Sequence, residues 1–132
     1  MTERINLEVP ASLRALSTVR MVLGGLGARL DFSIDDLEDL YLATEELLRA
    51  ALRSEGLDRV KVEVEVDGSQ LRLAAGLFNS PDLRRAVEMT TQGEECLDLC
   101  TLLRSTIDEI TIDVREAEYC VVLVKRRAEA IA

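Results

Sequence analysis

The chain has 132 residues, of which 48% are hydrophobic and 3% aromatic, and its 25 acidic and 16 basic side chains leave a net charge of −9 with no histidine. A chain of this length buries roughly two thirds of its unfolded surface, so we expect one domain over residues 1–127 and a frayed tail over residues 128–132. The lack of histidine excludes Ser-His-Asp and Cys-His catalysis and histidine metal sites, and we expect no metal centre. The negative charge and the scarcity of aromatic rings argue against direct nucleic-acid binding.

The N-terminal segment gives no sign of export. Residues 1–7 alternate polar and apolar side chains and lack the apolar centre of a signal peptide. No window approaches the ~18 consecutive apolar residues that a membrane-spanning helix needs. The three cysteines are an odd number in a chain large enough to fold without disulfides. We therefore expect a cytoplasmic protein with reduced thiols and no membrane contact.

A strand and a helix are expected first. Alternating apolar residues over 5–9 predict a strand that ends at Pro10. Apolar residues then recur at helical spacing over 13–30, with Ser12 as the expected N-cap. This helix contains three glycines, Gly24, Gly25 and Gly27. Each weakens a helix by about 1 kcal/mol relative to alanine, so we expect close packing or a looser C-terminal half.

The second expected helix has a clear start. Ser33 to Asp36 reads as a capping box, and the acidic residues that follow suit the positive end of the helix dipole. We expect this helix to run from Ile34 to about Arg53, with Gly56 as its stop.

Strands and shorter helices follow. Valines alternate with charged residues over 60–66, and Asp67-Gly68 predicts a hairpin loop that returns the chain through residues 71–75. The later expected elements are a short helix over 83–89, a loop over 90–93, a longer helix over about 95–105, strands over 110–114 and 119–124 joined by a turn at Glu116-Ala117, and a basic run, Lys125 to Arg127, that leads into the tail. Amphipathic helices and alternating strands each need one covered face. The predicted fold class is therefore α+β, a two-layer sandwich whose mixed, mostly antiparallel sheet is covered on one face by helices.

The second helix carries the segment behind a family resemblance. Residues 42–46, Leu-Ala-Thr-Glu-Glu, together with the element order, resemble the GHKL ATPases (the Bergerat or histidine-kinase-ATPase-like fold), and among them the bacterial anti-sigma factor serine kinases. In that family a glutamate of this helix acts as a base, and an asparagine four residues later holds magnesium on the nucleotide phosphates. The resemblance puts Glu46 at the glutamate position and Ala50 at the asparagine position. A methyl group offers magnesium no oxygen ligand.

The family's adenine-binding motif is changed as well. In the family an aspartate reads the adenine, and glycines allow its close approach. The matching stretch is residues 73–79, which puts Ala75 at the aspartate position and Leu77 and Asn79 at the glycine positions. No carboxylate remains there to accept a hydrogen bond from the adenine amino group.

The third motif of the family is a glycine-rich phosphate loop before the last helix, whose backbone N–H groups approach the phosphates. Residues 96–101 stand there, with Leu97 and Leu99 in place of glycines. Together with Leu77 and Phe78, they are expected to fill the former nucleotide cavity. The resemblance thus implies a degenerate site that uses no cofactor.

The resemblance also implies a regulatory binding protein. In the anti-sigma factors an arginine of the first helix engages a sigma factor or its antagonist, and Arg20 occupies that place with Arg14 nearby. The planar guanidinium suits carboxylate partners. We expect an anti-sigma-factor-like protein in a partner-switching system that controls transcription, independent of nucleotide, with Glu46 vestigial. Its partners would be a sigma factor, an anti-anti-sigma factor or both, and dimerisation through the first strand and helix, usual in the family, implies a homodimer. The alternative is an active serine protein kinase that uses Glu46, ATP and magnesium on an anti-anti-sigma factor.

Three features have a structural interpretation beside the functional one. Cys96 and Cys100 share a helix face and so offer a thiol-based sensor, although buried cysteines are common core residues. The acidic run from Asp31 to Glu46 is either a docking surface for a basic partner or a solvated helix face. Arg14 and Arg20 are either partner contacts or ordinary exposed arginines.

Overall fold

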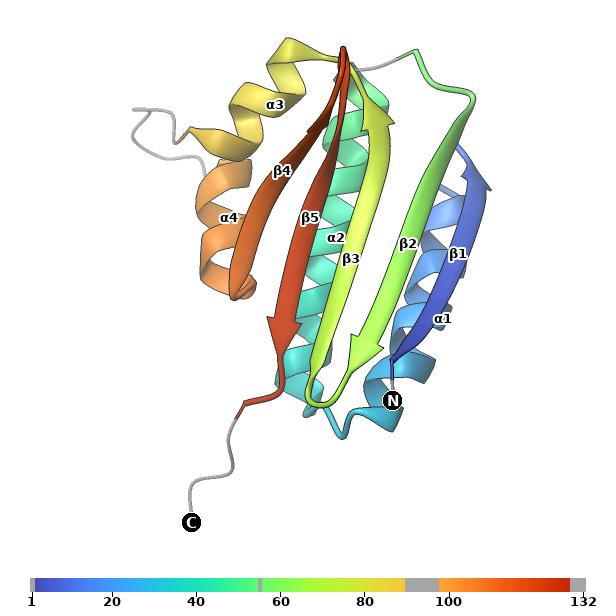
Figure 1. The fold of residues 1–132 in the computed structure, drawn as a ribbon, viewed down its shortest axis with the longest axis vertical. Coiled ribbons are helices and arrows are strands. Elements are labelled where there is room, and N and C mark those ends of the chain that lie inside the picture. Colours follow the sequence, from blue (N-terminus) through green and yellow to red (C-terminus); the bar gives the residue numbers. More distant parts are fainter. Residues whose placement is uncertain (1, 55, 90–97, 129–132) are drawn as a thin grey trace.

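The protein forms an antiparallel sheet whose helices all lie on one face (Figure 1). The computed structural model describes residues 2–54, 56–89 and 98–128. The elements in chain order are β1 (Glu3–Pro10), α1 (Ala15–Arg29), α2 (Ile34–Ser54), β2 (Arg59–Asp67), β3 (Gln70–Phe78), α3 (Pro81–Glu88), α4 (Leu99–Thr106), β4 (Glu109–Arg115) and β5 (Glu118–Arg126). The predicted two-layer α+β sandwich is confirmed, and each pair of described neighbouring strands is antiparallel.

The strand order is β1-β2-β3-β5-β4, so β1 and β4 form the two edges of the sheet. Side-chain alternation decides which residues face the helices. The four valines of β2 are buried, whereas Lys61 is exposed on the opposite, open face. On β5 the buried series Tyr119, Val121 and Leu123 continues to Lys125, which is 8% exposed. The strand therefore runs two residues beyond the expected end at Val124 and includes part of the basic run.

Of the two predicted hairpin turns, one is shifted by a residue and the other lies where it was predicted. The hairpin between β2 and β3 is confirmed, but Asp67 pairs with Gln70, so the loop residues are Gly68 and Ser69. Gly68 has φ +64°, a conformation that glycine adopts without strain. The turn predicted at Glu116-Ala117 is confirmed between β4 and β5.

Helix starts follow their caps. The capping box of α2 is confirmed, because the Ser33 N–H donates to Asp36 Oδ2 (3.3 Å) and the Asp36 N–H donates to Ser33 Oγ (3.0 Å). The Ser12 cap is wrong, since residues 11–14 form turns and Arg14 is the N-cap of α1. α4 begins at Leu99, where Asp98 Oδ1 accepts the Thr101 N–H (2.8 Å), and ends at Thr106.

The glycines of α1 divide into two kinds. A methyl group at Gly24 would come within 2.6 Å of the Tyr41 hydroxyl, and one at Gly27 would collide with the end of the Leu37 side chain. Both neighbours belong to α2, so these two glycines let α1 and α2 pack closely, as the sequence predicted. Gly25 is exposed, and a methyl group there would meet no atom within 4 Å.

We expect Gly25→Ala to raise the free energy of unfolding by about 0.5–1 kcal/mol, because alanine loses less backbone entropy in an exposed helix position. Gly27→Ala has the same intrinsic gain but must displace Leu37, so it should be clearly less stable than Gly25→Ala. Urea unfolding followed by circular dichroism measures both variants against the wild type. Equal stabilisation by both would contradict the close-packing role of Gly27.

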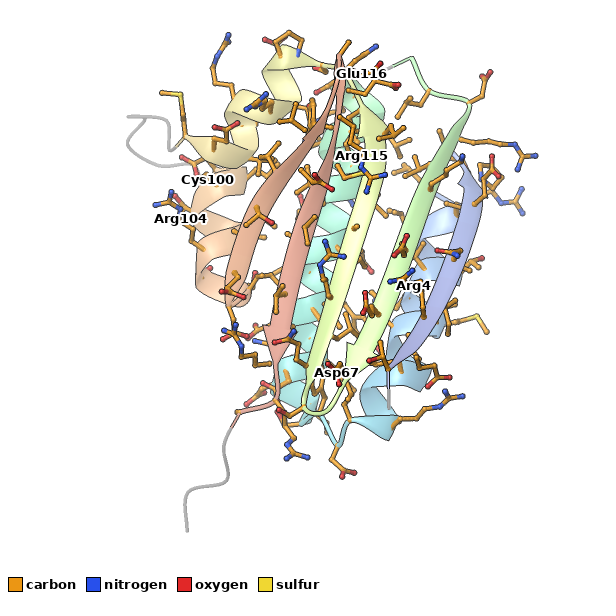
Figure 2. The ribbon with its side chains drawn as sticks, in the orientation of Figure 1. Arg4, Asp67, Cys100, Arg104, Arg115 and Glu116 are labelled. Carbon is orange, nitrogen blue, oxygen red and sulfur yellow. The ribbon has the colours of Figure 1, made fainter. Side chains whose placement is uncertain are left out.

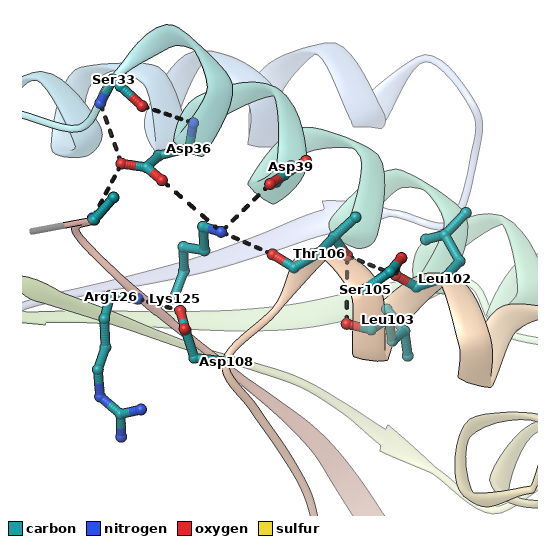
Figure 3. A network of polar contacts seen from close by, with 11 residues as sticks. Ser33, Asp36, Asp39, Leu102, Leu103, Ser105, Thr106, Asp108, Lys125 and Arg126 are labelled. Atoms are coloured by element: carbon teal, nitrogen blue, oxygen red, sulfur yellow. Dashed lines mark hydrogen bonds and ion pairs between the residues drawn. The ribbon is translucent and has the colours of Figure 1, made fainter.

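One buried ammonium group joins three elements at the end of the sheet where β5 finishes (Figure 3). Lys125 Nζ donates to the carbonyl oxygen of Thr106 at 2.9 Å, and it lies 4.0 Å from Asp36 Oδ1 and 3.5 Å from Asp39 Oδ2. Asp36 is itself buried, at 6% exposure. Beside it, Asp108 Oδ2 accepts the Arg126 N–H at 2.7 Å. Lys125 on β5 thus ties the start of α2 to the end of α4.

We expect Lys125→Met to lower the free energy of unfolding by about 3 kcal/mol, because it leaves the Asp36 carboxylate buried without its cation. The matched control is Arg126→Met, since Arg126 is the next residue but pairs with Glu109 at the surface (2.6 Å). That exposed pair is worth under about 1 kcal/mol. Denaturant unfolding of both variants checks the prediction, which fails if the two losses are alike.

Candidate functional site

Arg20 stands on α1 over the surface of α2, where two side chains hold it. Its guanidinium lies 4.5 Å from the ring centroid of Tyr41, and Arg20 Nη1 lies 3.4 Å from Glu45 Oε1. The side chain is still 55% exposed. A guanidinium stacked on an aromatic ring keeps N–H groups at its edge for a further acceptor. Arg20 is therefore oriented and accessible at the same time.

Arg14 lies one residue before α1, as its N-cap, and is exposed. Its carbonyl oxygen accepts the Ser17 hydroxyl at 2.9 Å. A cation at this end of a helix gains nothing from the helix dipole, whose positive end it faces. Arg14 thus lies just before α1 and Arg20 lies on it, and among the described contacts only the Arg20 side chain is held by an aromatic ring and a carboxylate.

On α2, Glu46 and Ala50 differ in exposure. The Glu46 side chain is 37% exposed and Oε1 lies 3.9 Å from Arg49 Nε, a weak contact one helical turn away. Ala50 is buried at 7% exposure. The position that the resemblance assigns to the metal ligand is thus a methyl group packed into the core.

On β3, Ala75 is fully buried and pairs with Val62 on one side and Val121 on the other. Phe78 is also fully buried, and its ring meets that of Tyr119 edge-on at 6.0 Å between centroids. The Tyr119 hydroxyl donates to the Ser80 carbonyl oxygen at 2.6 Å. An aromatic pair and a buried hydrogen bond therefore close this end of the β3–β5 pair, and Phe78 is part of the hydrophobic core.

Leu77 lies elsewhere. It is 37% exposed and lines a hollow of about 510 Å³ on the open face of the sheet, together with Gly76 and Cys120. The register of β3 against β5 shifts between Ala75 and Phe78, which accounts for the change of face. Leu77, which was predicted to help fill the former nucleotide cavity, thus lies on the open face of the sheet. In the same hollow, burial raises the pKa of the Cys120 thiol, which disfavours the reactive thiolate.

The remaining positions that the resemblance assigns to nucleotide motifs lie at the ends of β3 and α4. Asn79 is exposed just after β3, and Leu99 is the half-buried first residue of α4. Leu97 lies outside the described residues, as do the loop predicted over 90–93 and the start of the long helix predicted from residue 95. A feature that the sequence reasoning missed is Asp98, whose carboxylate caps the N-terminus of α4 through the Thr101 N–H. The Asp-x-x-Thr spacing is the signal that would have predicted it.

The acidic run from Asp31 to Glu46 is partly used inside the protein. Asp36 is buried in the capping box, Asp39 contacts Lys125, and Glu45 contacts Arg20. These internal contacts involve three of the seven acidic residues in the run. Of the two cysteines proposed as a thiol pair, Cys100 is a free thiol, fully buried on α4, and Cys96 lies outside the described residues.

Comparisons with known proteins agree with this fold. The solved structure of the RsbU and RsbW domains of Rv1364c from Mycobacterium tuberculosis matches 94% of this chain with a TM-score of 0.68 and 16% identity, and the match covers 32% of that chain. In sequence, the chain is 34% identical over 62 residues to the serine-protein kinase RsbW of Bacillus velezensis. No family model matches the chain.

The fold is that of the GHKL ATPase-like proteins, and the resemblance to their anti-sigma factor serine kinase type is confirmed. The sequence match spans 47% of this chain and 39% of the Bacillus velezensis protein, so less than half of that relative is compared. Among the described residues, no helix has the length and apolar composition needed to cross a lipid bilayer.

Proposed function

We propose that this protein is an anti-sigma-factor-like regulatory binding protein of a partner-switching system, which acts on transcription in the cytoplasm without nucleotide control. Its partner is a sigma factor or an anti-anti-sigma factor, and the contact is made through the α1–α2 surface. The observation that carries the proposal is the bracing of Arg20 by Tyr41 and Glu45, which leaves the side chain 55% exposed. Fixing the rotamer in advance lowers the entropy lost when a partner carboxylate binds.

Independence from nucleotide is supported by the chemistry of three positions. Ala50 and Ala75 bring methyl groups, both buried, to the places where the family binds magnesium and adenine. Asp98 adds a carboxylate at the N-terminus of α4 and uses the Thr101 N–H. A phosphate at that helix end would meet a negative charge instead of a free N–H group.

We also propose a homodimer built through β1 and α1. β1 is a sheet edge that pairs with β2 alone among the described strands. Next to it, α1 exposes Met21 at 77% and the preceding turn exposes Leu13 at 58%. Exposed apolar side chains beside an edge strand are typical of surfaces that bind another chain.

A second candidate function is an active serine protein kinase, which the name of the Bacillus velezensis relative favours. Glu46 retains a part-exposed carboxylate on α2 and would be its base. Under this alternative the protein binds ATP with magnesium and transfers phosphate to an anti-anti-sigma factor.

Nucleotide titration separates the two candidates. A ligand that binds only the folded state must stabilise it. Because we propose that the protein does not bind nucleotide, we expect Mg-ATP and Mg-ADP to produce no saturable heat in calorimetry and no rise in melting temperature. Saturable binding, together with transfer of labelled phosphate that Glu46→Gln abolishes, would establish the kinase instead.

Reversing the charge of Arg20 tests the partner surface. We expect the wild type, used as bait in extracts of its own cells, to recover a sigma factor or an anti-anti-sigma factor. We expect Arg20→Glu to bind the purified partner at least about tenfold more weakly, because a charged contact becomes repulsive. The control is Arg85→Glu on α3, an equal charge change at an exposed arginine that, like Arg20, pairs with an acidic neighbour (Asp82, 3.4 Å). Recovery of neither kind of protein, or an equal effect of both variants, would refute the proposal.

A further inference from the structure

A hollow of about 540 Å³ lies between the edge of β4 and the helices α3 and α4. Its apolar lining comes from Val87, Ile107, Ile110 and Ile112. Val87 and Ile107 are buried, but Ile110 and Ile112 on β4 are only half-buried. Nearby on the same strand, Val114 is 52% exposed. The helix-facing side chains of β4 thus extend beyond the cover that α3 and α4 provide.

The strand beside this hollow has an open edge. Among the described strands, β4 pairs only with β5, so alternate residues direct backbone N–H and C=O groups away from the sheet. Natural sheets usually protect such edges with proline, lysine or a bulge. β1, the other edge, ends in Pro10, whereas the seven residues of β4 contain neither proline nor lysine and pair regularly with β5. A regular, open edge next to an apolar hollow can accept an additional strand.

The charges around the hollow favour an acidic segment. Glu88 is held by Arg84 at 2.6 Å, and the Asp108 carboxylate accepts the Arg126 N–H at 2.7 Å. Arg104, labelled on the outer side of α4 in Figure 2, lines the hollow and is exposed, and it forms no ion pair with any described residue. The two arginines and two carboxylates of the lining balance in charge, and Arg104 is the lining arginine whose N–H groups no described carboxylate takes up.

The shape favours one extended segment over a second copy of the chain. In Figure 1, α3 and α4 lie beyond the β4 edge, so two copies brought together edge to edge would meet at these helices before their strands paired. A single strand needs only about 4.8 Å beside β4.

We propose that the β4 edge and the hollow beside it form a second docking site, which takes an extended segment of a partner protein by strand addition. The segment pairs its backbone with β4, places alternate apolar side chains against Ile110 and Ile112, and brings an acidic side chain to Arg104. The site goes beyond the proposed function and does not depend on it, because Arg20 lies on α1, behind the opposite edge of the sheet (Figure 1).

The test uses capped heptapeptides. Threonine occupies every second position, and the positions between carry isoleucine, valine and, nearest one end, glutamate. Two peptides carry the glutamate at opposite ends, since β4 admits either strand direction, and two controls carry lysine in its place. Binding to the full chain is measured by fluorescence anisotropy, and amide chemical shifts locate it. We expect one glutamate peptide to bind saturably and to shift amide resonances along β4. Arg104→Glu should weaken the affinity for this peptide roughly fivefold. The matching lysine peptide should bind Arg104→Glu more tightly than it binds the wild type.

Two further variants complete the test. Ile112→Lys places a charge among the apolar side chains of the edge, where it can reach solvent without unfolding the protein, and it should abolish binding. Arg20→Glu should leave peptide binding unchanged, so a failure of the Arg20 surface remains distinct from a failure of this one. Absence of saturable binding by either glutamate peptide, or indifference to both Arg104→Glu and Ile112→Lys, overturns the proposal. Concentration-dependent dimers that Ile112→Lys dissociates would overturn it too, by showing that a second copy occupies the edge.

Discussion

The ammonium group of Lys125 is the contact on which the arrangement of the helices at one end of the sheet depends. It reaches from β5 to the Thr106 carbonyl oxygen at the end of α4 and to Asp36 and Asp39 in the first turns of α2. Burying one charge without a partner would lower the free energy of unfolding by several kcal/mol. The buried lysine therefore needs its carboxylates, and the buried Asp36 needs the lysine. Because the α2 register is held at this end, the positions of Glu45, Glu46 and Ala50 further along the helix are held as well.

On the side of α2 that faces α1, a glycine of α1 fixes the geometry of the Arg20 surface. Gly24 leaves room for the Tyr41 hydroxyl, and the ring of Tyr41 then lies under Arg20. A larger residue at position 24 would push the ring away and remove the support of the guanidinium. The glycines that make α1 an intrinsically poor helix therefore contribute to the geometry of the surface that we propose for partner binding.

Periodicity alone was sufficient to predict the fold, because each strand and helix shows a clean pattern on its covered face. The valines of β2 and the capping box at Ser33 and Asp36 are local signals, and local signals fix element type. What depended on tertiary contact was not predictable in the same way. Lys125 was assigned to a basic run before the tail, although its place two residues after Leu123 continues the inward series of β5. The position of Leu77 on the open face was not predictable either, because the register shift of β3 against β5 leaves no mark in the sequence.

If the nucleotide site is lost, as we propose, residues at its motif positions serve as core. A protein with a bound nucleotide obtains part of its stability there from the ligand, whereas here Phe78 packs edge-on against Tyr119, and Phe78, Tyr119 and Ala75 are nearly or fully buried. Removing polar ligands from a cavity while leaving it open would cost packing energy, so loss of the motifs and filling of the space are expected to occur together. Asp98 fits the same proposal, since a helix end that faces no phosphate still has N–H groups to satisfy, and a carboxylate satisfies one of them locally. Under this proposal a single substitution would not create a nucleotide site: Ala50→Asn would bury an amide at a core position that is 7% exposed.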